Sequence, residues 1–115
     1  MITQRFRDMF ADIYNYAASM TAPARAIDGP CMYRSPNGPC LVGFVISDEE
    51  AAKCEGHGFE YSMRHGLMPS LEWQNEDEQF LMCDIQFAHD FSIVNGDWHG
   101  QMMIRLDNVK ERMNG

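Results

Sequence analysis

Apolar residues near both ends of the chain recur at the spacing of an α-helix, and no other feature constrains the fold as much. They return every three or four positions from residue 3 to about residue 22 and again from residue 98 to residue 113, which places them on one stripe of each helix. The stripes comprise Phe6, Met9, Phe10, Ile13, Tyr14, Ala17 and Met20 in the first helix and Trp98, Met102, Leu106, Val109 and Met113 in the last. Thr3 can cap the first helix, and Pro23 ends it because proline lacks an N–H. We expect both helices to pack on a shared core by these stripes.

The middle of the chain predicts a β-hairpin. Two arms, residues 31–34 and 40–46, flank the segment 35–39, in which proline presets φ and Asn-Gly tolerates positive φ. The second arm is apolar on both faces, so helices should cover it on each side. Gly43 within this arm marks a bulge or a close approach of two backbone segments.

Helix-capping patterns follow the hairpin. Ser47 and Glu50 form a capping box, which predicts a short helix that ends at Gly56. Residues 59–65 are expected to form one or two helical turns closed by Gly66.

A longer helix is expected from residue 76 onward. Its acidic opening, residues 76–78, suits the positive end of a helix dipole. The residues that follow, 80–91, are apolar nearly all round the helix, so this helix should be central in the fold. Residues 95–97 then form a turn and cap before the last helix.

These elements predict an α+β fold, a small mostly helical domain packed around a two-stranded antiparallel β-hairpin. At 115 residues, with 45% apolar and 23% charged residues, the chain has the size and composition of one domain with one core. No internal repeat or linker divides the sequence. We expect residues 1–115 to form a single globular domain.

The net charge of −8 narrows the classes of partner. Only nine Lys and Arg are spread over the chain, whereas phosphate binding needs them clustered, so direct nucleic-acid binding is not expected. A basic or neutral partner fits better. The longest apolar run, residues 41–46, is far shorter than the ~20 residues of a membrane span, and the N-terminus lacks an apolar signal segment. We expect no membrane association and a cytoplasmic location.

Cysteine and histidine residues raise the question of a zinc site. Cys31, Cys40, His57, His65 and His89 are of the residue types that bind zinc, but eight residues separate the two cysteines, and zinc motifs usually bring two ligands within a C-x₂₋₄-C loop. Pairing in the predicted hairpin would place the two cysteines roughly 10 to 13 Å apart, beyond the ~7 Å Cα limit of a disulfide. Reduced cysteines, no metal and no cofactor are predicted.

His89, Asp90 and Cys83 could be interpreted as a base, an orienting carboxylate and a nucleophile. Neighbouring residues on a helix point about 100° apart, so His89 and Asp90 are instead expected to end a helix, with the histidine near its negative pole. The sequence contains no hydrolase, phosphate-loop, zinc-protease or calcium-loop motif. An enzyme is not predicted.

Several residues favour a binding role. Ten methionines are unusual for this length, and flexible thioethers suit adaptable protein-binding surfaces, although core filling is the commoner use. Adjacent Met102 and Met103 place at least one side chain off the buried stripe of the last helix. Trp73, in an irregular polar stretch, is a candidate exposed anchor. Tyr33 and Arg34 point to opposite faces of the first hairpin arm; Tyr33 packs, and Arg34 either pairs with a local carboxylate or contacts a partner. These five are the candidate binding residues.

The hairpin region also carries a family resemblance. The matching residues are Cys31-Met32-Tyr33-Arg34, Gly38, Cys40, Gly43, Ile46, Asp48, Glu55-Gly56, Gln86, His89-Asp90 and Trp98. This pattern resembles that of a group of uncharacterised small proteins of tailed phages and proteobacterial prophages, over about residues 31 to 98. Ser47 stands where the group's pattern has proline. The resemblance implies a phage or bacterial cytoplasm as the source and implies no activity.

Three functions are weighed on these grounds. The first is a phage-type accessory protein that binds a host protein stoichiometrically in the host cytoplasm, as an inhibitor of a defence or nucleic-acid-processing factor. The second is a sponge or sensor for a nucleotide-like anion held by Arg34, Arg64 and His65. The third is a DNA mimic that uses the acidic surface. A zinc module or small metal-dependent enzyme ranks below these, and both a monomer and a homodimer are compatible with the sequence.

Overall fold

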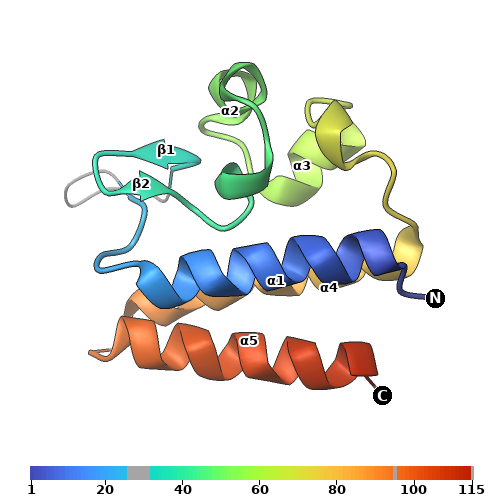
Figure 1. The fold of residues 1–115 in the computed structure, drawn as a ribbon. Coiled ribbons are helices and arrows are strands. Elements are labelled where there is room, and N and C mark those ends of the chain that lie inside the picture. The colour runs from blue at the N-terminus through green and yellow to red at the C-terminus, as the bar shows by residue number, and fades with distance from the viewer. Residues whose placement is uncertain (26–31, 95, 115) are drawn as a thin grey trace.

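The computed structural model describes residues 1–25, 32–94 and 96–114. It has the predicted small, mostly helical α+β fold with a two-stranded antiparallel hairpin (Figure 1). In chain order the elements are α1 (Gln4–Ser19), β1 (Arg34–Ser35), β2 (Gly38–Pro39), the 3₁₀ helix η1 (Gly43–Val45), α2 (Asp48–Cys54), α3 (Phe59–Arg64), η2 (Pro69–Leu71), α4 (Glu76–Asp90), η3 (Phe91–Val94) and α5 (Trp98–Asn114).

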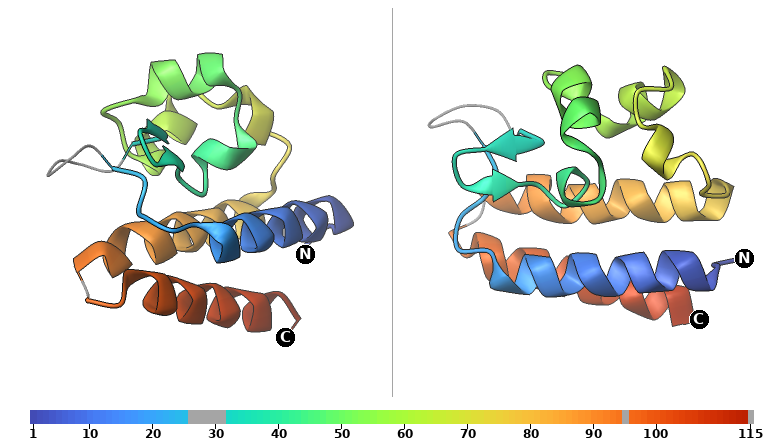
Figure 2. Two further views of the ribbon diagram at one scale, coloured as in Figure 1. Left: turned by 60° about the vertical axis from the view of Figure 1, so that its left-hand side comes forward. Right: turned by 45° about the horizontal axis from the view of Figure 1, so that its top comes forward.

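The three long helices run alongside one another. Helix α5 packs against both α1 and α4, and the hairpin, α2 and α3 lie on the opposite side of α1 and α4 (Figures 1 and 2). Helix α3 contacts α4, and η1 contacts α1. Buried apolar side chains from all five α-helices join one core. None of the helices in the described residues is long and apolar enough to cross a membrane.

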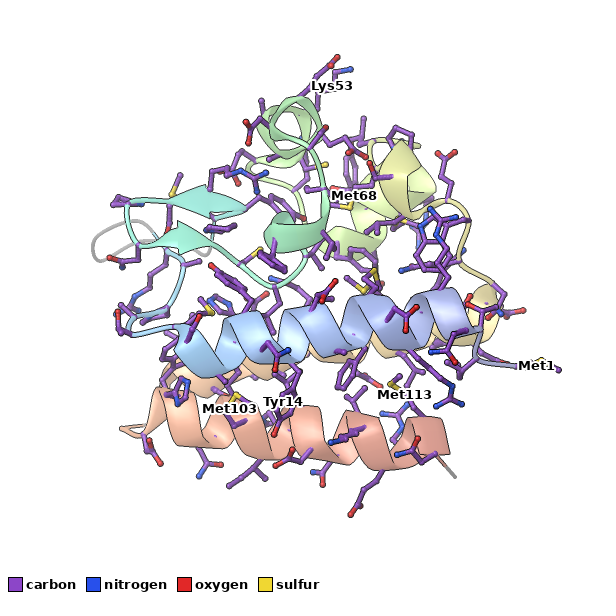
Figure 3. The ribbon with its side chains drawn as sticks, viewed as in Figure 1. Met1, Tyr14, Lys53, Met68, Met103 and Met113 are labelled. Atoms are coloured by element: carbon purple, nitrogen blue, oxygen red, sulfur yellow. The ribbon has the colours of Figure 1, made fainter. Side chains whose placement is uncertain are left out.

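Helix α1 forms as its apolar stripe predicts. The Thr3 hydroxyl accepts a hydrogen bond from the Phe6 N–H, and the predicted core stripe is buried or half-buried along the whole helix. The helix ends at Ser19, three residues earlier than expected. The Ser19 hydroxyl donates to the Tyr16 carbonyl, which competes with continuation of the helical ladder. Tyr14 of α1 donates to Asp107 of α5 over 2.7 Å, in the contact between the two helices (Figure 3).

The hairpin is much shorter than predicted. Its strands have two residues each, with Arg34 opposite Pro39 and Ser35 opposite Gly38. The expectation of a strand over residues 40–46 is wrong, because a turn and η1 occupy that stretch. Pro39 has no N–H to extend the ladder, and the Phe44 N–H bonds back to the Cys40 carbonyl. Residue 31 of the predicted first arm lies outside the described residues.

Gly43 marks a close backbone approach, as predicted. A Cβ atom at this position would overlap the carbonyl oxygen of Tyr33. Only glycine allows the 3₁₀ turn to lie this close to the first hairpin arm. The glycine therefore fixes the spacing between η1 and β1.

Both predicted short helices are present. In α2 the Ser47 hydroxyl accepts from the Glu50 N–H, and the Glu50 carboxylate accepts from the Ser47 N–H, which confirms the capping box. Glu50 also accepts hydrogen bonds from the N–H and the hydroxyl of Ser70. Helix α3 is followed by Gly66 with φ 69°, the conformation that ends a helix most easily at glycine.

Helix α4 has a second capping box, which the sequence analysis did not identify. Asn75 and Glu78 exchange side-chain to backbone hydrogen bonds, and the buried Glu78 carboxylate also accepts from the N–H and hydroxyl of Thr3. Glu78 therefore joins the starts of α1 and α4. The helix is central, with contacts to α3, η3 and α5.

Helix α5 packs by the predicted stripe. Met102, Leu106, Val109 and Met113 are buried, and Met113 lies between α1 and α5 in Figure 3. The Asp97 carboxylate accepts from the Gly100 N–H, as an N-cap does. Met103 lies off the buried stripe and is half-buried, which confirms that one of the adjacent methionines leaves the stripe.

Candidate functional site

One face of α4, continued by the first residue of η3, exposes large aromatic side chains. Phe80 is 64% exposed, Phe87 42% and Phe91 54%, although burial of the whole helix circumference was expected. The three residues recur at i, i+7 and i+11, which forms a second stripe on the helix. The opposite face is buried in the core through Leu81, Met82, Ile85 and Ala88.

A groove runs beside this stripe, between α3 and α4. We call it the α3–α4 groove; its volume is about 820 Å³. Phe59, Met63, Cys83 and the exposed Phe80 and Phe87 form its apolar part. Its charged part holds four carboxylates and two guanidinium groups, from Glu60, Glu72, Glu76, Asp84, Arg64 and Arg112.

The electrostatic character of the groove is acidic. Arg112 is paired with Asp84, so one of the two guanidinium groups in the groove is already neutralised. The remaining charged groups of the groove are three carboxylates and the single guanidinium group of Arg64. An apolar groove with an acidic margin is complementary to a segment that carries both apolar and basic side chains.

Cys83 in this groove is a poor nucleophile. Desolvation, together with the nearby carboxylates of Glu60 and Asp84, raises the pKa of its thiol to about 11. Because the thiolate is the reactive species, the thiol is largely unreactive at neutral pH. The arrangement does not assemble Cys83 with His89 as a catalytic pair, since His89 lies on the buried face of α4.

His89 and Asp90 nonetheless form a pair, contrary to the sequence-based expectation. The His89 Nδ1 atom lies 2.7 Å from the Asp90 carboxylate, and the His89 Nε2 atom accepts the N–H of Ala24 over 2.9 Å. An accepting Nε2 requires the proton to be on Nδ1, so the ring is neutral. The side chains therefore bridge the 100° offset at the last turn of α4. Nε2 is occupied by the backbone, so it is not free to act as a base.

A second hollow lies beside the hairpin. We call it the hairpin hollow; its volume is about 500 Å³. Its walls include the rings of Tyr33 and Phe59 and the Cys40 thiol, and its charged groups are Glu55 and Asp90. Burial raises the pKa of the Cys40 thiol to about 12, so Cys40 behaves as a small apolar side chain. Phe59 lines both this hollow and the α3–α4 groove.

Tyr33 and Arg34 hold the hairpin to the rest of the fold. The buried Tyr33 donates its hydroxyl hydrogen to the His57 carbonyl, 2.8 Å away, and burial raises the pKa of Tyr33. Arg34 pairs with Asp48 over 3.0 Å and donates to the carbonyl of Ile46 over 3.0 Å and to that of Gly43. Of the two expectations for Arg34, a contact with a partner or pairing with a local carboxylate, the structure shows the pairing, with Asp48.

The other candidate binding residues are dispersed. Met102 is fully buried in the core, Met103 is half-buried on α5, and Trp73 is half-buried with the Arg5 guanidinium 4.2 Å from its ring centre. The structure does not bring these three together with Tyr33 and Arg34 on one surface. Sequence reasoning missed the exposure of Phe80, Phe87 and Phe91, because residues 80–91 are apolar nearly all round the helix and their i, i+7, i+11 spacing does not stand out from the rest.

The placement of the residues gives less support to the other functions considered, a nucleotide-like anion site, a DNA mimic and a zinc site. Arg64 lines the α3–α4 groove, whereas Arg34 is engaged by Asp48 and by backbone carbonyls. Two of the acidic residues, Glu50 and Glu78, are buried in capping boxes and so are not available to imitate phosphates. Within residues 1–25, 32–94 and 96–114, no three His, Cys, Asp or Glu side chains gather in a group that could hold a metal ion. Cys31 lies outside these residues, so the predicted distance between Cys31 and Cys40 has no counterpart in the described structure.

Comparison with protein-family models, curated proteins and solved structures finds no match to this chain.

Proposed function

We propose that this protein is a protein-binding module whose α3–α4 groove receives a basic, partly apolar segment of a partner. The exposure of Phe80 and Phe87, which line the groove, carries the proposal. Contiguous apolar surface of this kind, bordered by charged residues, marks protein-interaction sites in soluble domains. An amphipathic helix is the occupant that matches this groove, because it presents apolar residues on one face and basic residues beside them.

The charge of the protein supports a basic partner. The net charge is −8, and the carboxylates of the groove outnumber its guanidinium groups. A surface of one sign steers oppositely charged partners and repels nucleic acid. The resemblance of the hairpin region to small phage proteins fits a role as an accessory protein that binds a host protein stoichiometrically and so inhibits it.

A designed peptide tests the groove directly. The probe is an 18-residue amphipathic helix of Leu and Lys, and a Leu and Glu helix of the same pattern is its charge control. We expect saturable 1:1 binding of the Lys peptide by fluorescence anisotropy and isothermal titration calorimetry, weakened by salt. No saturable binding, or equal binding of both peptides, contradicts the proposal.

Matched variants localise the binding. Phe80→Ser combined with Phe87→Ser removes two exposed rings from the groove, and Ile104→Ser removes an equally exposed apolar residue from α5. The double variant should weaken binding at least tenfold, whereas Ile104→Ser should leave it unchanged. Equal loss in the double variant and in Ile104→Ser would show attraction to the acidic protein as a whole. The same set of variants then identifies the host partner, as the protein that the parent retains from lysate and the double variant does not.

A further inference from the structure

We propose that the hairpin hollow is a binding site for an organic cation with an apolar stem, such as an alkylguanidinium or alkylammonium group. The site is separate from the proposed docking of a partner helix in the α3–α4 groove, although Phe59 borders both. Its volume of about 500 Å³ is in the range of small-ligand sites.

The charge of the hollow favours a cation. Glu55 and Asp90 contribute carboxylates, and none of its described lining residues is Lys or Arg. Both Glu55 oxygens accept backbone N–H groups, from Tyr33 and Arg34, which hold the carboxylate in a fixed orientation. The hollow at the junction of hairpin and helix therefore has the sign opposite to that of an anion site.

Asp90 is the anchor of the site. Its Oδ1 atom lies 2.7 Å from His89 Nδ1 and 3.0 Å from Gln86 Nε2. Both donors are neutral: Gln86 is an amide, and the Nε2 atom of His89 accepts a backbone N–H and so carries no proton. The donors orient the carboxylate without cancelling its charge, and no described residue donates to Oδ2, so this oxygen can accept from a ligand.

The donors to Asp90 are themselves fixed. Gln86 is buried, and its Oε1 atom accepts the Val42 N–H over 3.0 Å. His89 is buried beneath Trp98, whose ring meets the imidazole edge-on. A carboxylate that is held in place before the ligand arrives loses little entropy on binding.

The walls of the hollow suit the stem and the charge of such a ligand. The rings of Tyr33 and Phe59 and the Met32 side chain provide apolar surface, which a chain of methylene groups can cover. Aromatic walls also attract a cation through the negative faces of their rings. A ligand with an apolar stem and a cationic end therefore matches both parts of the hollow.

Two probes distinguish the sources of this chemistry. Agmatine represents a free amine, and N-acetylarginine amide represents an arginine side chain of a peptide. Saturable binding of either by ¹⁵N chemical-shift titration, with shifts at residues of the hollow, supports the site, and the tighter of the two identifies the source. The absence of saturable shifts with both, or preferential binding of inorganic phosphate, overturns the proposal.

Two variants and a matched control complete the test. Asp90→Asn keeps the oxygen that accepts from His89 and Gln86 but removes the charge, and it should weaken binding at least tenfold. Gly58→Leu adds a side chain at the hollow, where a Cβ meets no atom within 4 Å, and should also weaken binding at least tenfold. Gly96→Leu adds the same side chain at an equally open position away from the hollow and should have no effect. Unchanged binding in both Asp90→Asn and Gly58→Leu overturns the proposal, and retained agmatine binding in Phe80→Ser with Phe87→Ser separates this site from the α3–α4 groove.

Discussion

Replacement of Glu78 by alanine should destabilise the fold far more than any other substitution in the first turn of α4. The Glu78 side chain is fully buried, and its carboxylate accepts hydrogen bonds from the Thr3 N–H at 3.0 Å, the Thr3 hydroxyl at 2.5 Å and the Asn75 N–H at 2.9 Å. The variant leaves three donors without their acceptor and separates the start of α1 from the start of α4.

The size of the effect follows from these contacts. Hydrogen bonds to a charged group contribute about 1.5 to 3 kcal/mol each, and donors left without an acceptor add a desolvation cost. The contributions of the three hydrogen bonds do not simply add, and water can reach the Thr3 donors at the exposed margin and replace part of what is lost. We therefore expect Glu78→Ala to lower the free energy of unfolding by about 3 to 5 kcal/mol, a large part of the ~5 to 15 kcal/mol of a small domain.

Glu76→Ala is the matched control. Glu76 is exposed in the same turn of the helix, so its loss removes only a favourable interaction with the helix dipole, about 0.3 to 1 kcal/mol. The assay is urea unfolding at pH 7, followed by circular dichroism at 222 nm and analysed by linear extrapolation. Equal destabilisation by Glu76→Ala and Glu78→Ala would refute the reasoning.

The pH dependence of the stability that Glu78 contributes gives a second readout. Burial raises the pKa of Glu78, but the hydrogen bonds from Thr3 and Asn75 outweigh it, so the net pKa is lower than usual. A carboxyl group whose pKa is lower in the folded than in the unfolded state contributes stability above the unfolded pKa, near 4.3, and loses it as the pH falls through the folded pKa. The difference in stability between the parent and Glu78→Gln should therefore shrink below about pH 4. A constant difference down to pH 2.5 would refute the charged role.

Two further predictions concern the region around η1 and the thiols. Gly43→Ala should lower the free energy of unfolding by about 1 to 3 kcal/mol, because its Cβ would overlap the Tyr33 carbonyl. Gly58→Ala is the control: its Cβ has open space around it, so it should change the free energy of unfolding by less than ~0.5 kcal/mol. Equal effects of the two variants in urea unfolding would contradict the overlap at Gly43. Cys40 and Cys83, with pKa values raised to about 12 and about 11 by burial, should react with iodoacetamide at pH 8 at least tenfold more slowly than free cysteine. Peptide mass spectrometry of the labelled protein measures this, and fast labelling of Cys40 in the folded protein would show that its burial is wrong.

Much of the candidate site was beyond sequence reasoning. The apolar residues 80–91 indicated a helix buried all round, but the elements packed against α4, which include α3, η3 and α5, cover only part of it, so Phe80, Phe87 and Phe91 remain exposed. The number and placement of the elements that pack around a helix are not encoded in its own periodicity. Tyr33 was selected as a binding residue and lines the hairpin hollow, while Asp90, the charged anchor proposed for that hollow, was interpreted only as a helix end.

The sequence by itself determined the elements whose stabilising contacts are local. The caps of α1 and α2 and the stripe of α5 depend on residues three or four positions apart, and such patterns can be read from the chain. Only the tertiary structure decided what residues 40–46 become and what His89 and Arg34 contact. The Val42 N–H bonds to Gln86, His89 accepts from Ala24, and Arg34 bonds to the carbonyl of Ile46. These partners lie 12 to 65 positions apart, and their burial requires hydrogen bonds that no local pattern specifies.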